Sequence, residues 1–242
     1  EPDFGTPDYI KVAGMKTIAD NFTKYTPGNG ILELRQAIVK KLKEDNGLDY
    51  TVNEVTTAVG AKQAIASAMM VIAGPGDEVL LPIPCWVSYT EMIRLAGATP
   101  VFVPAAITPR TKAIVICTPN NPTGAVYSEE SLRELADLAV KHDFFIVADE
   151  IYEKMVYDGA KHFSVASISR EVWERTITVN GFSKAYAMTG WRIGYAAARA
   201  DMIKGIMAVQ SQTTSATSAI SQKAALAALQ GSQHDMQVMV EE

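Results

Sequence analysis

The stretch SEESLRELADLAVKHDFFIVAD, residues 128–149, predicts a helix followed by a buried strand. Ser128 is a favourable helix N-cap residue, because its hydroxyl can accept a hydrogen bond from an N–H group of the first turn. The run FFIVAD is almost wholly apolar, which is typical of a strand that helices cover on both faces. A helix leading into such a strand indicates one unit of an α/β protein.

Short apolar runs alternate with helical patterns on either side of this stretch. The expected strands are EVTTAV (54–59), EVLLP (78–82), PVFV (100–103), AIVIC (113–117), TITVN (176–180) and RIGYAAA (192–198). Helices are expected from Gly60, around 86–96 and beyond Asp201, with breaks at 211–215 and at Gly231. The alternation predicts an α/β fold in which helices sandwich a mostly parallel, mixed sheet.

Residues 31–45 predict a surface helix packed on a core. Ile31, Leu34, Ile38 and Leu42 fall on one face of it, and Asn46-Gly47 supplies a stop signal at its end. No repeat or low-complexity linker divides the sequence, so we expect a single domain over residues 1–242.

The composition limits the classes of function. With 48% hydrophobic and 20% charged residues among 242, the chain is expected to fold around a substantial core. Its formal net charge of −5 disfavours a nucleic-acid partner, because such binding depends on neutralising phosphates with basic side chains. No apolar stretch approaches the roughly 18 residues that a membrane span requires, so no membrane partner is expected.

Cysteines and histidines give no sign of a metal centre. Cys85 and Cys117 form no disulfide framework and lack metal-ligand spacing, which favours a reducing and therefore cytoplasmic setting. His142, His162 and His234 also lack such spacing, and we expect them at surface or capping positions. We therefore assign no metal ligands.

Polar residues follow three of the expected strands. AIVIC runs into TPNNPTG (118–124) with Asn121, FFIVA runs into Asp149 and Tyr152, and TITVN runs into GFSK with Lys184. Ligands of open parallel sheets bind beyond the carboxyl ends of the strands, so an amide, a carboxylate, a phenol and an amine are expected to converge there. Each motif alone also has an ordinary reading as a turn, a cap or a solvated lysine.

This set of groups suits pyridoxal 5'-phosphate (PLP). PLP chemistry requires an amine for a Schiff base and a carboxylate that keeps the pyridine nitrogen protonated. A phenol and an amide can hydrogen-bond the ring hydroxyl, and an arginine can bind the phosphate through two hydrogen bonds. Arg192, eight positions beyond Lys184, is the candidate for the phosphate.

Taken together, the motifs resemble those of the fold-type I, class I aminotransferases. The resemblance is carried by EPDFGTP (1–7), YTPGNG (25–30), PCWVSY (84–89), TPNNPTG (118–124), ADEIY (148–152) and SKAYAMTGWRIGY (183–195). It implies that the chain is the PLP-binding large domain of such an enzyme, similar to the aspartate/prephenate aminotransferase subgroup.

The resemblance implies a role for each matching residue. Lys184 would form the Schiff base and move the substrate α-proton, and Asp149 would face the pyridine nitrogen. Tyr152 and Asn121 would hydrogen-bond the ring hydroxyl. The cofactor's ring face would lie against Trp86, and Arg192 would bind its phosphate.

Three further matches concern the phosphate, the partner subunit and the substrate. VGAKQAI (59–65) resembles the family's phosphate cradle, in which N–H groups of Gly60, Ala61 and Lys62 open a helix toward the anion. Tyr25 matches a tyrosine that reaches the phosphate of the neighbouring subunit, which implies a homodimer. A lysine at the position of Lys62 is associated in the subgroup with the distal carboxylate of the substrate.

The sequence departs from the family pattern in three places. An N-terminal segment before residue 1, an insert after residue 104 and a small C-terminal domain after Glu242 are absent from it. The small domain carries the arginine that binds the substrate α-carboxylate. The expected function is transfer of an amino group between an acidic amino acid, aspartate first, and a 2-oxo acid such as 2-oxoglutarate. The alternatives are a PLP-dependent β-lyase or synthase, a PLP-sensing module, and a PLP-binding core with little or no transaminase activity.

Overall fold

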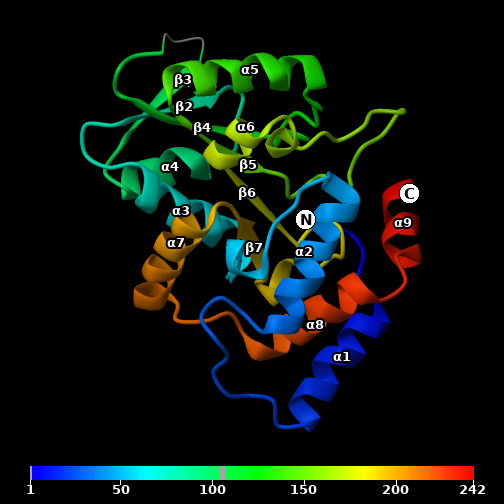
Figure 1. Ribbon diagram of the computed structural model, residues 1–242. Coiled ribbons are helices and arrows are strands. Elements are labelled where there is room, and N and C mark those ends of the chain that lie inside the picture. The colour runs from blue at the N-terminus through cyan, green and yellow to red at the C-terminus, as the bar shows by residue number, and fades with distance from the viewer. Residues whose placement is uncertain (1, 104–106) are drawn as a thin grey trace.

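The computed structural model describes residues 2–103 and 107–242 and has a seven-stranded sheet at its centre (Figure 1). The strands lie in the order β1-β7-β6-β5-β4-β2-β3. Their bounds are β1 (Val55–Ala58), β2 (Glu78–Pro82), β3 (Thr99–Val103), β4 (Thr111–Cys117), β5 (Phe145–Asp149), β6 (Thr176–Gly181) and β7 (Gly194–Ala197). Strand β7 pairs antiparallel with both β1 and β6, and the other pairs are parallel. The expected α/β class with a mostly parallel, mixed sheet is confirmed.

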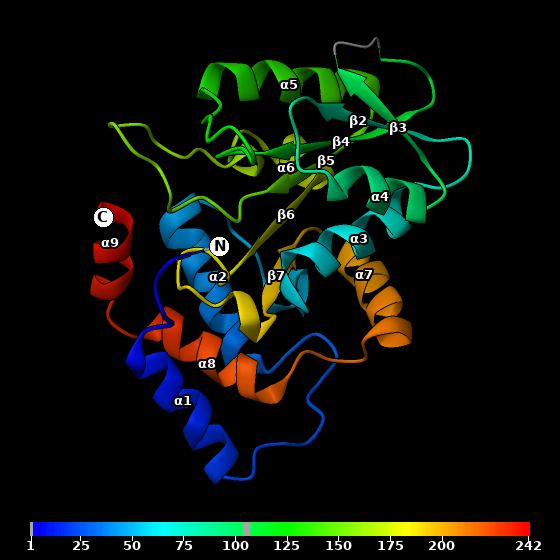
Figure 2. The same ribbon diagram turned by 180° about the vertical axis from the view of Figure 1, so that it is seen from behind.

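Helices cover both faces of this sheet (Figures 1 and 2). The helices of the described residues are α1 (Asp8–Ala19), α2 (Leu32–Asn46), α3 (Gly60–Ile72), α4 (Ser88–Leu95), α5 (Glu129–His142), α6 (Arg170–Arg175), α7 (Ala200–Thr213), α8 (Ala219–Gln230) and α9 (His234–Glu241). One face packs against α3, α4 and α7. The other face packs against α5 and α6 at one end and against α2 and α8 at the other.

The side chains of β4 show how one strand serves both layers. Val115 and Cys117 join the core beneath α3 and α4, whereas Ile114 and Ile116 join the core beneath α5. Successive side chains of a strand point to opposite faces, so a strand covered on both sides must be apolar at every position. This is why AIVIC shows no polar alternation.

Local signals in the sequence set several helix ends. Ser128 caps α5 by accepting a hydrogen bond from the Ser131 N–H at 3.1 Å. Gly47 ends α2 in the left-handed conformation at φ 68°, which glycine adopts without a steric penalty. Both ends match the sequence-based expectation.

Helix α1 was not expected, and its packing explains why. Its buried residues are Ile10, Gly14 and Thr17, so the face toward α8 is small and weakly apolar. Apart from Ile10, its larger apolar side chains are exposed: Val12, Met15 and Ile18. A helix whose apolar residues face outward lacks the periodic core-facing stripe that reveals helices in a sequence.

Three further points concern the expected boundaries. Strand β7 is shorter than the expected 192–198, because Arg192 adopts a left-handed conformation at φ 53° after the short 3-10 helix Thr189–Trp191. The expected insert site after residue 104 lies outside the described residues. Within the part of the chain that the structure describes, no helix is long and apolar enough to cross a membrane.

Candidate active site

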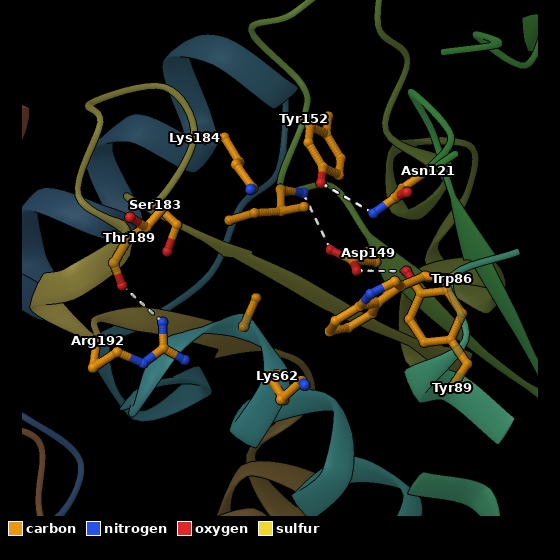
Figure 3. A pocket seen from close by; sticks show the side chains of 12 residues that line it. Lys62, Trp86, Tyr89, Asn121, Asp149, Tyr152, Ser183, Lys184, Thr189 and Arg192 are labelled. Atoms are coloured by element: carbon orange, nitrogen blue, oxygen red, sulfur yellow. Dashed lines mark hydrogen bonds between the residues drawn. The ribbon is translucent and has the colours of Figure 1, made fainter. Parts of the chain in front are cut away.

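A cavity of about 400 Å³ opens at the carboxyl ends of β4, β5 and β6 (Figure 3). Its lining comes from the segments after these strands, from the start of α3 and from the region of α4. The lining residues are Ala61, Lys62, Trp86, Tyr89, Asn121, Asp149, Ile151, Tyr152, Ser183, Lys184, Thr189 and Arg192. The fold therefore brings together an amine, a carboxylate, a phenol, an amide and a guanidinium group from distant parts of the sequence.

Asp149 is the last residue of β5 and is 3% exposed. The Tyr89 hydroxyl donates a hydrogen bond to its Oδ2 at 2.6 Å, and the Ile151 N–H donates to its Oδ1 at 3.2 Å. Burial raises the pKa of Asp149 to about 6, although both hydrogen bonds act in the opposite direction. A buried carboxylate of this kind gains most from a cationic or N–H partner placed in the cavity.

Lys184 follows β6, and in Figure 3 its side chain extends into the same cavity from the side opposite Asp149. Its Nζ lies 5.6 Å from the centroid of the Tyr152 ring. The Tyr152 hydroxyl accepts a hydrogen bond from Asn121 Nδ2 at 3.2 Å, and burial raises the pKa of this phenol. The phenol and the amide thus form one polar group between the amine and the carboxylate.

A candidate anion-binding end of the cavity lies where α3 begins. The N-cap residue of this 13-residue helix, Val59, makes no side-chain cap hydrogen bond, and the N–H groups of a first helical turn have no partner within the helix. The Arg192 guanidinium is close by, and its Nη1 donates a hydrogen bond to the Thr189 carbonyl oxygen at 2.9 Å. Gly60 has φ +77°, and a Cβ built there would lie 2.7 Å from Arg192 Nη2. Glycine at position 60 therefore permits the close approach of the arginine to the helix start.

Trp86 and Lys62 form a wall of the cavity. The Trp86 ring meets Tyr89 edge to face, with ring centroids 5.4 Å apart at 90°. The Nζ of Lys62, an exposed residue, lies 4.8 Å from the centroid of the Trp86 ring. The wall thus has a cation lying over a face of the Trp86 ring.

The structure brings together nearly all of the site residues expected from the sequence. Lys184, Asp149, Tyr152, Asn121, Arg192, Trp86, Ala61 and Lys62 all line this cavity, and Gly60 adjoins it through Arg192. Tyr25 does not line it. This tyrosine lies between α1 and α2 and is 92% exposed.

Sequence reasoning missed four lining residues: Tyr89, Ile151, Ser183 and Thr189. Tyr89 was the most consequential omission, because its hydroxyl donates a hydrogen bond to the Asp149 carboxylate. It stands three residues after Trp86 in the motif PCWVSY. That spacing was the available signal, since residues three apart share one side of a helical turn.

A second cluster of ionisable groups lies behind the turn after β5. Among the described residues, Glu150, Glu153 and His162 offer ligand atoms within 4.8 Å of one another. His162 Nε2 is 3.2 Å from a Glu150 carboxylate oxygen, Lys41 forms an ion pair with Glu153, and Asn46 donates to Glu153 at 2.8 Å. The ammonium of Lys41 already supplies a cation here, so the cluster is a buried ion-pair network. The surface or capping position expected for His162 was wrong, because its side chain is only 9% exposed.

Comparison with known proteins identifies the family that this chain matches. Residues 1–242 match the family described as aminotransferase class I and II. An aspartate aminotransferase of Pinus pinaster is 49% identical over 95% of this chain and 50% of its own length. A probable aspartate/prephenate aminotransferase of Thermus aquaticus is 50% identical over 95% of this chain and 63% of its own length. The chain thus spans between half and two thirds of these relatives.

Solved structures show the same architecture. The aspartate aminotransferase of Thermus thermophilus with maleate superimposes with a TM-score of 0.94 at 47% identity, over 100% of this chain and 66% of that one. The aromatic aminotransferase of Pyrococcus horikoshii OT3 superimposes with a TM-score of 0.97 at 39% identity, over 100% of this chain and 69% of that one. The described fold is therefore that of these enzymes over the matched region.

Proposed function

The chain belongs to the class I and II aminotransferases, and we propose from this that it carries PLP on Lys184 and transfers an amino group between an acidic amino acid and a 2-oxo acid. Aspartate and 2-oxoglutarate are the proposed pair. One observation supports this above others: the Lys184 amine, the buried Asp149 carboxylate and the Arg192 guanidinium line a single cavity of about 400 Å³. The cavity's polar groups are those that a phosphorylated pyridine aldehyde requires.

The residues present fit this cofactor. When bound, PLP supplies an aldehyde that condenses with amines and a protonated ring that withdraws electrons from the substrate Cα. In the proposed arrangement, Asp149 holds the proton on the ring nitrogen, and Tyr152 and Asn121 donate hydrogen bonds to the ring hydroxyl. Lys184 would hold the aldehyde carbon until the substrate amine displaces it, and its released amine would then move the proton at the substrate Cα.

The remaining contacts bind and orient the cofactor. Arg192 and the N–H groups of Gly60, Ala61 and Lys62 would hold the phosphate, because the uncapped start of α3 and the guanidinium both favour an anion. The Trp86 ring would pack against the face of the pyridine. These contacts fix the reacting carbon relative to Lys184.

The preference for an acidic substrate rests on Lys62 and on the relatives. Lys62 places an exposed ammonium group at the edge of the cavity, beside Trp86. A cation there attracts the distal carboxylate of a dicarboxylic amino acid. The names of the similar proteins, aspartate aminotransferase and aspartate/prephenate aminotransferase, support the same substrate class.

We further propose that residues 1–242 form one PLP-binding large domain and that the active unit is a homodimer. Tyr25 is 92% exposed, and Val12, Met15 and Ile18 of α1 are also exposed and lie three residues apart along the helix. Burial of these side chains against a second copy would remove apolar surface from water. Tyr25 would then reach the phosphate in the partner's cavity. Unpaired Cys85 and Cys117 are compatible with the proposed cytoplasmic location.

Reduction with borohydride tests the cofactor assignment. The purified protein is incubated with PLP and reduced, and its peptides are analysed by mass spectrometry. The reduced cofactor is expected on Lys184, and Lys184→Ala should abolish it. Lys62→Ala, which removes the other lysine of the cavity, serves as the matched control and should retain it. A wild-type protein without modified Lys184 would refute the proposal.

Product analysis separates the reactions that one PLP site can support. With aspartate and 2-oxoglutarate, oxaloacetate and glutamate are the expected products. PLP binding with cleavage or ring-forming products would favour a β-lyase or synthase. PLP binding without turnover would favour a binding core or a sensing module.

A further inference from the structure

Tyr89 is tied to the centre of the site although it lies 60 residues from Asp149 in the sequence. Its side chain is 2% exposed, and its hydroxyl donates to Asp149 Oδ2 at 2.6 Å (Figure 3). Its ring is held in place by the edge-to-face contact with Trp86. The other oxygen of Asp149 accepts the Ile151 N–H, so both carboxylate oxygens have a fixed donor.

The surroundings of Tyr89 argue against a proton-transfer role. Burial, and next the charge of Asp149, raise the pKa of the Tyr89 phenol well above its ordinary value. Its proton is therefore retained at neutral pH and is already engaged in the bond to Asp149. A short hydrogen bond from a neutral phenol to a carboxylate stabilises the charged form of the carboxylate.

We propose that Tyr89 is a positioning residue that fixes the orientation of the Asp149 carboxylate toward the cavity and favours its charged form. The consequence for PLP rests on the function proposed above, whereas the link between Tyr89 and Asp149 does not. Without this donor, the buried Asp149 carboxylate would more readily take up a proton. It would then have no charge with which to hold a proton on a ring nitrogen.

Several ionisable groups surround the Asp149 carboxyl group, and they act differently. They are Tyr89 from α4, Cys117 from β4, Glu150 and Tyr152 from the turn after β5, and Lys184 across the cavity. Glu150 raises the pKa of Asp149 through its charge, whereas the Tyr89 hydrogen bond lowers it. Removing the Tyr89 hydroxyl alone should therefore move the titration of Asp149 to higher pH.

The experiment isolates Asp149 by difference. The free energy of unfolding is measured against pH for four proteins without PLP: wild type, Tyr89→Phe, Asp149→Asn and the double variant. The unfolding free energy of the protein with Asp149 is compared with that of the matching Asp149→Asn protein, once with Tyr89 present and once in Tyr89→Phe. The pH dependence of each difference reports the titration of the Asp149 carboxyl group alone. Because Tyr89→Phe removes a hydrogen bond to a charged group, the midpoint of the Asp149 titration should rise by about one to two pH units in this variant.

Tyr50→Phe provides the matched control. Tyr50 is also buried, at 6% exposure, but its hydroxyl makes no hydrogen bond to Asp149 and its ring packs on Trp173, outside the cavity lining. It should leave the Asp149 midpoint unchanged. A midpoint that stays the same in Tyr89→Phe, or that moves equally in Tyr50→Phe, overturns the proposal. If Tyr89→Phe is too unstable for this measurement, the infrared band of the protonated carboxyl group reads the same titration in the folded protein.

The binding of PLP supplies the second readout. A shift of the Asp149 midpoint from about 6 to between 7 and 8 leaves roughly half to a tenth of the carboxyl groups ionised at pH 7. The affinity of Tyr89→Phe for PLP should then fall roughly two- to tenfold, while Tyr50→Phe binds as wild type does. A shifted midpoint with no PLP binding by the wild type would refute the proposed function and leave the link between Tyr89 and Asp149 intact. Unchanged affinity despite a shifted midpoint would overturn its role toward the cofactor.

Discussion

Replacing Asp149 by asparagine should stabilise the cofactor-free protein at neutral pH. Burial raises the pKa of Asp149 from 3.8 to about 6, so the folded protein keeps a proton on this group that the unfolded chain has already released. The resulting stability is fully present below pH 3.8 and is lost as the pH rises through about 6. The difference of about two pKa units corresponds to about 3 kcal/mol. Asparagine does not ionise, so Asp149→Asn does not lose this stability as the pH rises.

Urea unfolding followed by circular dichroism at several pH values between 4 and 8 measures this effect. The free energy of unfolding of Asp149→Asn relative to wild type should rise by about 2.5 kcal/mol between pH 4 and pH 8. Any loss from altered hydrogen bonds to Tyr89 and Ile151 adds a constant offset, so the pH-dependent part is the decisive quantity. A difference that stays constant from pH 4 to pH 8 would refute the reasoning.

Two matched measurements complete this test. Asp137→Asn removes an exposed carboxylate on α5, which is solvated in both states, and should leave the shape of the curve unchanged. Saturating PLP should reverse the ranking at pH 7. The carboxylate of the wild type then gains a cationic partner, whereas the amide introduced by Asp149→Asn cannot hold a proton on the ring nitrogen.

Two other substitutions test the buried ion-pair network around Glu150 and the candidate anion-binding end of the cavity. Burial alone would lower the pKa of His162, but the hydrogen bond and charge of Glu150 raise it above the ordinary value of 6.5. The stability that protonated His162 contributes is therefore fully present below pH 6.5 and is lost as the pH rises through the raised pKa. In thermal unfolding, His162→Gln should therefore cost more stability at pH 6 than at pH 9, and an equal cost at both would contradict the ion pair. Gly60→Ala should destabilise the protein by about 1–2 kcal/mol and also weaken PLP binding, because its Cβ would lie 2.7 Å from Arg192 Nη2. Gly47→Ala, at φ +68° with nothing within 4 Å, should destabilise similarly but leave the affinity for PLP unchanged in a fluorescence titration.

Much of the fold could be predicted because its signals are local. The strands could be recognised as short apolar runs, and the ends of α2 and α5 followed from Gly47 and Ser128. The convergence of Asn121, Asp149 and Lys184 could also be expected, since each follows a strand of the same sheet. Helix α1 could not, because most of its larger apolar residues face outward and, apart from Ile10, its buried side is carried by small residues.

By itself, the sequence determined the order of the strands and of most helices, the class of the sheet and the set of chemical groups at its carboxyl edge. Only the tertiary structure decided which of these groups touch. The Tyr89 hydroxyl reaches Asp149 across 60 residues, Arg192 approaches Gly60, and Glu150 pairs with His162 within a buried network. Periodicity and capping act over one or two turns of chain, whereas these contacts depend on how layers pack against one another. The proton affinity of Asp149 follows from that packing, because burial and donor geometry arise only when the layers are assembled.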